Sequence, residues 1–165
     1  MTLFRKKLHN PIGARLTALF RKKLHKPVMY KSTSTLERQL EQLNAIDSSK
    51  LSDSAKTLLK HDITRIKQGV EGENRVKFQL QNSHMPMYVL HDLNLEYDGL
   101  SAQIDFLVIT RKRNFVIECK NNHGSIEIDE RGTFIQTTDT GRKGIESPVT
   151  QNERHLALVN KYAYI

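Results

Sequence analysis

Two acidic side chains and one lysine are placed to share a site near the middle of the chain. Asp105 lies in one apolar run, and Glu118-Cys119-Lys120 ends the next. Strand side chains alternate between the two faces of a sheet, so Glu118 and Lys120 point to the same side. We therefore expect two carboxylates and one ammonium group to converge at one edge of a sheet.

These residue types suit metal-dependent cleavage of a phosphodiester. A hard divalent cation such as Mg²⁺ prefers carboxylate, carbonyl and water oxygens, and such sites also accept Mn²⁺. Asp105 and Glu118 would supply two anionic ligands, and the backbone carbonyl of Cys119 a third. Lys120 would orient or deprotonate a metal-bound water and offset the charge that develops during in-line attack. The alternative is a salt-bridged polar face of an ordinary strand pair, in which Lys120 only neutralises the acids.

Short motifs spread in order along the chain resemble the nuclease-related domain (NERD) family. They are Gly72-Glu73, His91-Asp92-Leu93, Gln103-Ile104-Asp105, Ile117-Glu118-Cys119-Lys120-Asn121, Gly124, Ile126, Pro148 and Gln151. The resemblance covers residues 69–160. That family is assigned to the PD-(D/E)xK, restriction-endonuclease-like fold. The resemblance therefore implies a mixed central sheet flanked by helices, and a nuclease site.

Further site residues are implied by this resemblance alone. It assigns Glu73, on the first core helix, to the metal directly or through water, and Gln151, on the last helix, to the same pocket. Gln103 and Asn121 match motif positions with structural or supporting roles. Cys119 stands where the family often has a β-branched residue, which still suits a buried position. In the simpler interpretation Glu73 is an acid favoured by the helix dipole, and Gln151 is solvated.

Other site chemistries find little support in the sequence. His91 and His123 flank the motifs, but lone histidines near strand ends usually satisfy local hydrogen bonds. There is no His-Glu-x-x-His or Cys-x-x-Cys spacing for zinc. There is also no Gly-x-Ser-x-Gly elbow and no phosphate-binding Walker loop.

The order of predicted elements indicates an α/β fold preceded by a helical hairpin. The capping-box pattern Ser34-Thr-Leu-Glu37 opens the hairpin, expected over residues 32–68, and Gly69 is placed to cap its second helix. The hairpin leucines would pack on the domain or form a two-helix dimer interface. The nuclease-like domain, residues 69–165, is then expected to contain a helix over 70–81, strands over 87–93, 102–110, 114–120, 125–129 and 133–138, a loop over 141–147, and a helix from Pro148.

Composition favours one intracellular domain with a basic appendage. The chain has 165 residues, 38% of them hydrophobic, and a single cysteine, which excludes an intramolecular disulfide framework. No apolar run approaches the length of a membrane span. Residues 1–31 hold nine Lys or Arg and no acid, and the remaining residues carry 17 basic against 18 acidic side chains. A cytoplasmic location is expected, with the basicity concentrated in the arm.

The arm contains a duplication whose role the sequence leaves open. The segment 3–11 recurs as 19–27 with one substitution. Its apolar residues follow helical spacing between Lys and Arg, which suits a basic amphipathic helix on nucleic acid or on a membrane surface. An organelle transit peptide shares this composition. The simplest alternative is a disordered tail, with nonspecific phosphate contact as the next.

The sequence as a whole favours a Mg²⁺-dependent nuclease-like domain that hydrolyses DNA. The competing classes are an inactive nucleic-acid-binding or scaffolding module and a membrane-surface protein guided by residues 1–31. A restriction-endonuclease-like core usually adds a strand after the last helix, so the domain is expected to be truncated at its end. The missing sheet edge would then come from a partner or from an earlier segment, or be absent.

Overall fold

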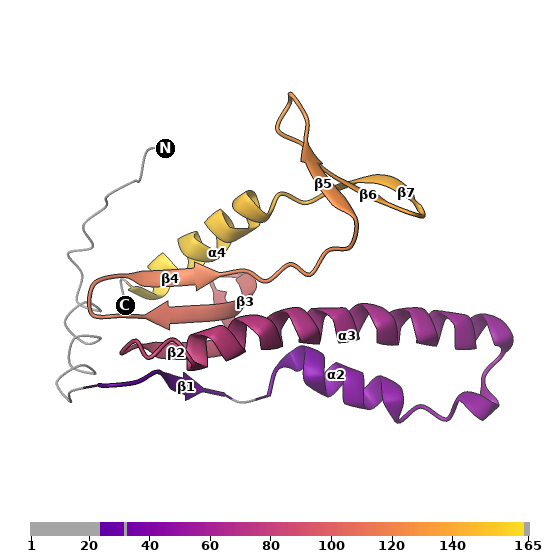
Figure 1. Cartoon of the computed structure of the whole chain (residues 1–165), viewed down its shortest axis with the longest axis horizontal. Coiled ribbons are helices and arrows are strands. Elements are labelled where there is room, and N and C mark those ends of the chain that lie inside the picture. Colours follow the sequence, from indigo (N-terminus) through magenta and orange to yellow (C-terminus); the bar gives the residue numbers. More distant parts are fainter. Residues whose placement is uncertain (1–23, 32, 164–165) are drawn as a thin grey trace.

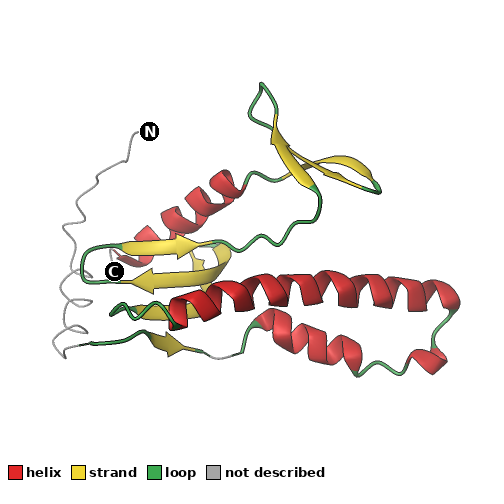
Figure 2. Cartoon of the chain, viewed as in Figure 1, coloured by secondary structure: helices red, strands yellow, loops and turns green. Residues whose placement is uncertain are grey.

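The computed structural model describes residues 24–31 and 33–163 of the chain. A helical hairpin comes first, then a series of strands, then a final helix (Figure 1, Figure 2). The helices are α2 (Thr35–Asn44), the short 3-10 helix η1 (Ser48–Lys50), α3 (Asp53–Gln81) and α4 (Pro148–Ala163). The strands are β1 (Val28–Tyr30), β2 (Tyr88–Tyr97), β3 (Leu100–Ile109), β4 (Asn114–Ile117), β5 (Ser125–Ile128), β6 (Phe134–Thr138) and β7 (Gly141–Ile145).

The centre of the protein is a mixed four-stranded sheet in the order β1-β2-β3-β4. β1 runs parallel to β2, whereas β2, β3 and β4 pair as antiparallel neighbours. Helices α3 and α4 lie on opposite faces of this sheet (Figure 1). The core on the α3 side consists of Met87, Val89, Phe106 and Val108, with Val76 and Leu80 of α3 packed against them. The predicted α/β class with a mixed sheet and a preceding helical hairpin is confirmed.

The strands that carry the site residues differ in length from the prediction. β2 and β3 are longer, and they are joined by the predicted turn Asp98-Gly99, whose two positive φ angles of 50° and 73° suit a tight hairpin. β4 is shorter and ends at Ile117, so Glu118 follows the strand instead of lying within it. Phe115, expected in the core, is 49% exposed because β4 is an edge strand with a neighbour on one side only.

Strand β1 is not predicted, and it lies within the segment 1–31 that is expected to form the basic arm. Its residues pair with β2 from Tyr88 to Leu90, and the ring of Tyr30 lies 6.0 Å from that of Tyr88 between centroids. Three residues are too few for a periodic strand signal. An earlier segment therefore does supply an edge of the sheet. The rest of the predicted arm, residues 1–23, lies outside the described residues.

Helix α3 runs without interruption from the hairpin into the nuclease-like domain. It begins at the N-cap Ser52 and continues to Gln81, so the prediction that Gly69 ends a helix is wrong. Gly69 and Gly72 are instead points of close approach. A Cβ atom at Gly69 would lie 2.8 Å from Leu36 Cδ1 of α2, and one at Gly72 would lie 2.9 Å from Asn121 Cβ. Tertiary packing thus favours glycine in the middle of this helix, and the usual breaker signal is overridden.

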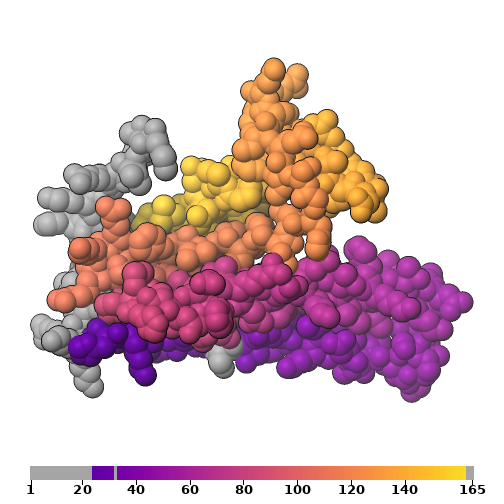
Figure 3. All heavy atoms as spheres, viewed as in Figure 1, coloured from indigo at the N-terminus to yellow at the C-terminus, as the bar shows by residue number. Residues whose placement is uncertain are grey.

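A second, three-stranded antiparallel sheet in the order β5-β6-β7 projects from the body between β4 and α4 (Figure 3). The predicted turn Arg131-Gly132 joins β5 to β6. The prediction of a loop over residues 141–147 is wrong, because Gly141–Ile145 forms β7 and pairs with β6. The strand is not predicted because its sequence is polar and rich in glycine, and such residues are depleted in strands. In the part of the chain that the structure describes, no helix is both long and apolar enough to cross a membrane.

The close contact at Gly72 leads to a stability prediction. A Gly-to-Ala change inside a helix normally stabilises it by about 0.5–1 kcal/mol. We expect Gly72→Ala to destabilise the protein instead, by about 1–2 kcal/mol, because the neighbouring Asn121 Cβ sits on the backbone and cannot rotate away. Urea unfolding measures the difference. Gly69→Ala is the matched control, since its neighbour is the movable end of Leu36 and a smaller loss is expected. Equal effects at both positions would contradict this account.

Candidate active site

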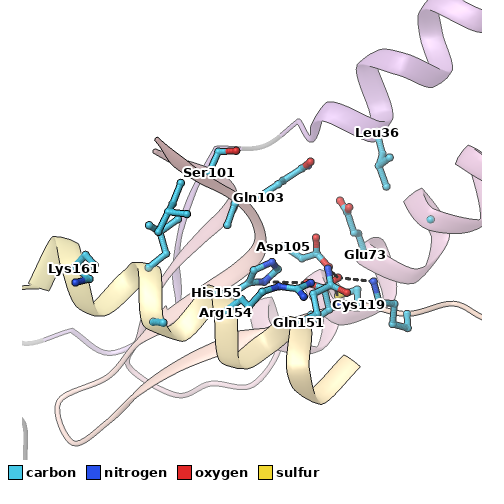
Figure 4. Close-up of a pocket in the computed structure, with 17 residues that line it drawn as sticks. Leu36, Glu73, Ser101, Gln103, Asp105, Cys119, Gln151, Arg154, His155 and Lys161 are labelled. Atoms are coloured by element: carbon cyan, nitrogen blue, oxygen red, sulfur yellow. Dashed lines mark hydrogen bonds and ion pairs between the residues drawn. The ribbon is translucent and has the colours of Figure 1, made fainter. Parts of the chain in front are cut away.

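A pocket of about 650 Å³ opens where α4, β3 and the middle of α3 meet (Figure 4). All five side chains named from the sequence as the site line it: Glu73, Asp105, Glu118, Lys120 and Gln151. They come from α3, β3, the segment after β4, and α4. The structure therefore brings together residues that span most of the nuclease-like domain.

Asp105 lies where strand β3 separates from both of its neighbours. On one side, the pairing of β3 with β4 stops at Phe106 and Ile117. On the other, the ladder between β2 and β3 is continuous except opposite Asp105, where Asp92 has a φ of 50°. The Asp105 carboxylate then replaces a strand partner, because its Oδ2 accepts a hydrogen bond of 2.6 Å from the Cys119 backbone N–H.

The environment of Asp105 disfavours a negative charge. The pKa of Asp105 is raised to about 6, chiefly by burial and also by the nearby acids Glu118 and Glu73, against the lowering effect of the Cys119 N–H bond and of Lys120. A carboxyl group with this pKa is ionised at neutral pH only at a cost. Perturbed carboxyl groups of this kind gather at functional sites, where a bound cation or proton offsets them.

Glu118 is bound by groups from two directions. Its Oε1 accepts hydrogen bonds from Lys120 Nζ at 2.7 Å and from Gln151 Nε2 at 2.8 Å. Its Oε2 is buried and has no hydrogen-bond partner, although His155 Nδ1 lies 3.4 Å away. Glu118, Lys120 and Gln151 thus meet in the structure, although residues 118–120 follow strand β4 and strand alternation does not apply to them.

Glu73 is held away from the other two acids. It is buried on α3, and its Oε2 lies 2.9 Å from Nε2 of His91, whose ring stacks on Phe106 with centroids 4.5 Å apart. His91 therefore satisfies a local hydrogen bond, which is the simpler of the two interpretations for it. For His123, the structure describes a backbone role, with its carbonyl accepting a bond of 2.7 Å from Gln136.

The sequence profile of the nuclease-related domain matches residues 68–164, more than half of the chain. The chain belongs to the nuclease-related domain family. Searches of curated proteins and of solved structures found no match to it. The match begins inside helix α3 and ends with α4, so it includes every pocket residue named from the sequence.

In this NERD chain, helix α4 contributes more to the pocket than the sequence indicates. Besides Gln151, the helix places Arg154, His155, Leu158 and Lys161 along the pocket wall. They recur every three or four residues, which is the spacing of one helix face. From periodicity alone, an apolar residue on this face such as Leu158 is assigned to the core. The polar residues on the same face can be assigned to a site only once the positions of the acids are known.

Asp92 is a second residue whose role the sequence does not reveal. It is 2% exposed and accepts hydrogen bonds from Thr35 N at 2.7 Å, Thr35 Oγ1 at 2.8 Å and Gln103 Nε2 at 2.5 Å, besides pairing with Lys31. Burial raises its pKa, but these hydrogen bonds outweigh burial and hold the pKa below the usual value. Asp92 thus ties the segment before α2 to the strand that carries Asp105.

The remaining motif residues have supporting roles in the structure. Asn121 Nδ2 donates a bond of 2.8 Å to the Gln68 carbonyl on α3, which fixes the segment after β4. Cys119 is half-buried against the core, and burial together with the neighbouring acids raises the pKa of its thiol to about 12. The thiol therefore stays protonated, and the position that is expected to be buried is half-buried in the structure.

The donor atoms fit a hard cation held by few protein ligands. Within the described ranges, no three His, Cys, Asp or Glu side chains are grouped closely enough to form a complete ligand set. Glu73 has its Oε2 engaged by His91, so Asp105 and Glu118 would be the main ligands. Mg²⁺ commonly binds through one or two carboxylates and keeps several waters. The buried, unbonded Glu118 Oε2 is the oxygen that most lacks a partner.

The raised pKa of Asp105 predicts a pH-dependent effect of removing its charge. In the folded protein the group binds a proton more tightly than in the unfolded chain, so its contribution is unfavourable above pH 6 and diminishes as pH falls from about 7 towards 4. We expect Asp105→Asn to stabilise the metal-free protein at pH 8 by on the order of 1–3 kcal/mol. The gain should be clearly smaller at pH 5. Urea unfolding in EDTA at both pH values measures it.

The matched control is Asp129→Asn. Backbone hydrogen bonds from Thr133 and Arg131 lower the pKa of this exposed carboxyl, so its replacement should not stabilise the protein at pH 8. If Asp105→Asn instead destabilises the protein equally at pH 8 and pH 5, the ionised Asp105 carboxylate does not reduce the stability of the folded protein.

Proposed function

We propose that this NERD protein hydrolyses phosphodiester bonds of DNA with the help of a divalent cation, Mg²⁺ or Mn²⁺, in the pocket. The observation that supports this most is the convergence of Asp105, Glu118 and Lys120 at the point where β3 separates from its neighbours. The spacing of these residues also matches the PD-(D/E)xK pattern. A salt-bridged polar face alone would not explain a buried carboxylate oxygen without a hydrogen bond, Glu118 Oε2, or the pocket beside it.

Each residue has a distinct role in this proposal. Asp105 and Glu118 hold the cation, which would supply Lewis-acid activation of the phosphate. The Cys119 carbonyl is proposed as a further ligand, and Glu73 acts on the cation through water while His91 fixes its position. Gln151 orients Glu118 through the bond to its Oε1.

Lys120 has the most direct part in the reaction. Its Nζ lies 2.7 Å from Glu118, and its side chain is 39% exposed, so the ammonium group borders both the carboxylate and the open pocket. From there it can orient the attacking water and stabilise negative charge on the phosphate oxygens. Lys120 is the more exposed partner of this ion pair, so its side chain remains accessible to substrate.

The test compares cleavage of labelled single-stranded and double-stranded DNA in Mg²⁺, Mn²⁺ or EDTA. We expect metal-dependent cleavage by the full chain and its loss in Glu118→Ala. Glu127→Ala is the matched control, because Glu127 also pairs with a cation, Arg142, but lies outside the pocket. Loss of cleavage in both variants would remove the support for this site.

Lys120→Ala separates catalysis from metal binding. We expect turnover to fall by about 10²–10⁴-fold, the range for loss of a positioned acid-base group, with metal affinity within a few fold of the parent. Lys143→Ala, on β7 outside the pocket, should leave turnover unchanged. A Lys120→Ala protein that cleaves at the parental rate would exclude the catalytic role.

The competing function is an inactive module of the same fold that binds nucleic acid. Folded protein that binds DNA and Mg²⁺ but gives no cleavage under any condition would favour it. The first 23 residues carry seven Lys or Arg and no acid, so they are proposed to add nonspecific phosphate contact or contact with a membrane surface. A deletion that tests this should end at residue 23, because removing 1–31 would also remove β1 and Lys31.

A further inference from the structure

The pocket extends well beyond the acids, along the groove between α4 and the first half of β3. Its wall on α4 runs from Gln151 to Lys161, and its wall on β3 runs from Leu100 to Asp105. Ten helical residues cover about 15 Å and five strand residues about 17 Å, so the two walls are of similar length. Figure 4 shows Lys161 at the far end of this groove, with Arg154 and His155 nearer Asp105.

The groove combines an apolar lining with cationic side chains. Leu100, Ala102, Ala157 and Leu158 line it, and Leu100 is 62% exposed there. Arg154 and Lys161 also line it, two helical turns apart on the same face of α4. Their separation along the helix axis is about 10 Å, so the two side chains can reach different phosphates of one strand.

Neither cation is held firmly by the residues that the structure describes. Arg154 pairs with Glu146, but both side chains are more than half exposed, and such a pair contributes little to stability. A phosphate group can therefore replace Glu146 at low cost. Apolar contact for bases beside cations for phosphates is the combination that single-stranded nucleic acid requires.

The size of the pocket argues against entry of an intact duplex. A volume of about 650 Å³ suits a ligand of a few rings, or one or two nucleotides. The far end of α4 is also fastened to the sheet: Tyr162 OH bonds to the Glu96 carbonyl and accepts a bond of 3.0 Å from the Glu96 N–H, and its ring meets Tyr97 edge-on at 6.0 Å.

We propose that the substrate enters this site as a single strand lying between α4 and β3, with its phosphates bound by Arg154 and Lys161 and one phosphodiester at Asp105 and Glu118, which line the same pocket. This inference rests on the proposed function, which it narrows to a substrate class. It makes Arg154 and Lys161 substrate-binding residues that act away from the bond that is cleaved.

The decisive experiment measures binding in EDTA, where cleavage cannot occur. The probes are a fluorescein-labelled 12-nucleotide single-stranded DNA and its blunt duplex, followed by anisotropy at several salt concentrations with the full chain. We expect the double variant Arg154→Ala/Lys161→Ala to weaken single-strand binding by about 10-fold or more and to reduce the salt slope by about 1.4, the value for two lost phosphate contacts. Duplex binding, which the basic N-terminal segment supports nonspecifically, should change by less than threefold.

The control is Arg65→Ala/Lys60→Ala on the exposed part of α3. Arg65 resembles Arg154 in holding an exposed ion pair, here with Asp62, and neither control residue lines the pocket. The control should leave both affinities unchanged. The charge-preserving variant Arg154→Lys/Lys161→Arg should recover most of the single-strand affinity.

Three results would overturn the inference: an unchanged single-strand affinity, an equal loss for duplex, or an equal loss in the control variant. These outcomes are separate from failure of the proposed function. A chain that never cleaves DNA can still show the binding loss, in which case the groove binds a single strand without hydrolysis. A chain that cleaves in a Glu118-dependent way, but whose KM for the single strand is unaffected by Arg154→Ala/Lys161→Ala, retains its function and lacks this binding groove.

Discussion

The separation of β3 from its neighbours at Asp105 is the constraint on which the rest of the site depends. A sheet normally satisfies every backbone group through its strands, and an unpaired N–H in a half-buried place is costly. Here a carboxylate takes the place of a strand partner for the Cys119 N–H. The same separation lets the chain after β4 turn towards α4, which is how Glu118 comes within reach of Gln151 and His155.

Charge around this point is arranged unevenly, and the imbalance follows from where each group is anchored. The acids are attached to buried backbone and cannot retreat into solvent, as the raised pKa of Asp105 reflects. The cations Lys120 and Arg154 are on long, exposed side chains that can move. The fixed part of the site therefore carries the unfavourable charge, and the mobile part can rearrange around what binds. Preorganised sites commonly store unfavourable energy in this way.

The sequence predicted the ingredients of the site better than the shape of the surrounding fold. Local spacing indicated that Glu118 and Lys120 lie on one side, although both follow β4 instead of lying in it, and the family resemblance assigned Glu73 and Gln151 to the same pocket. The sequence could not reveal β1, the continuous α3 or the groove wall formed by Arg154 and Lys161. Each of these depends on contacts between distant segments, such as Leu36 against Gly69 and Val28 against Tyr88. The low helix propensity of glycine even predicts, wrongly, that a helix ends at Gly69, because the glycine is explained only by its packing against Leu36.

Because α3 is continuous, the family match does not begin at the start of a structural element. The family match begins at residue 68, in the middle of that helix. A fragment cut there would begin with a frayed helix end, without the Ser52 cap. It would also strip Lys31 and Thr35 from Asp92, leaving a buried carboxylate with Gln103 as its one remaining partner among those described. The contacts that complete the surroundings of Asp92 therefore extend upstream of the family match, as far as Lys31.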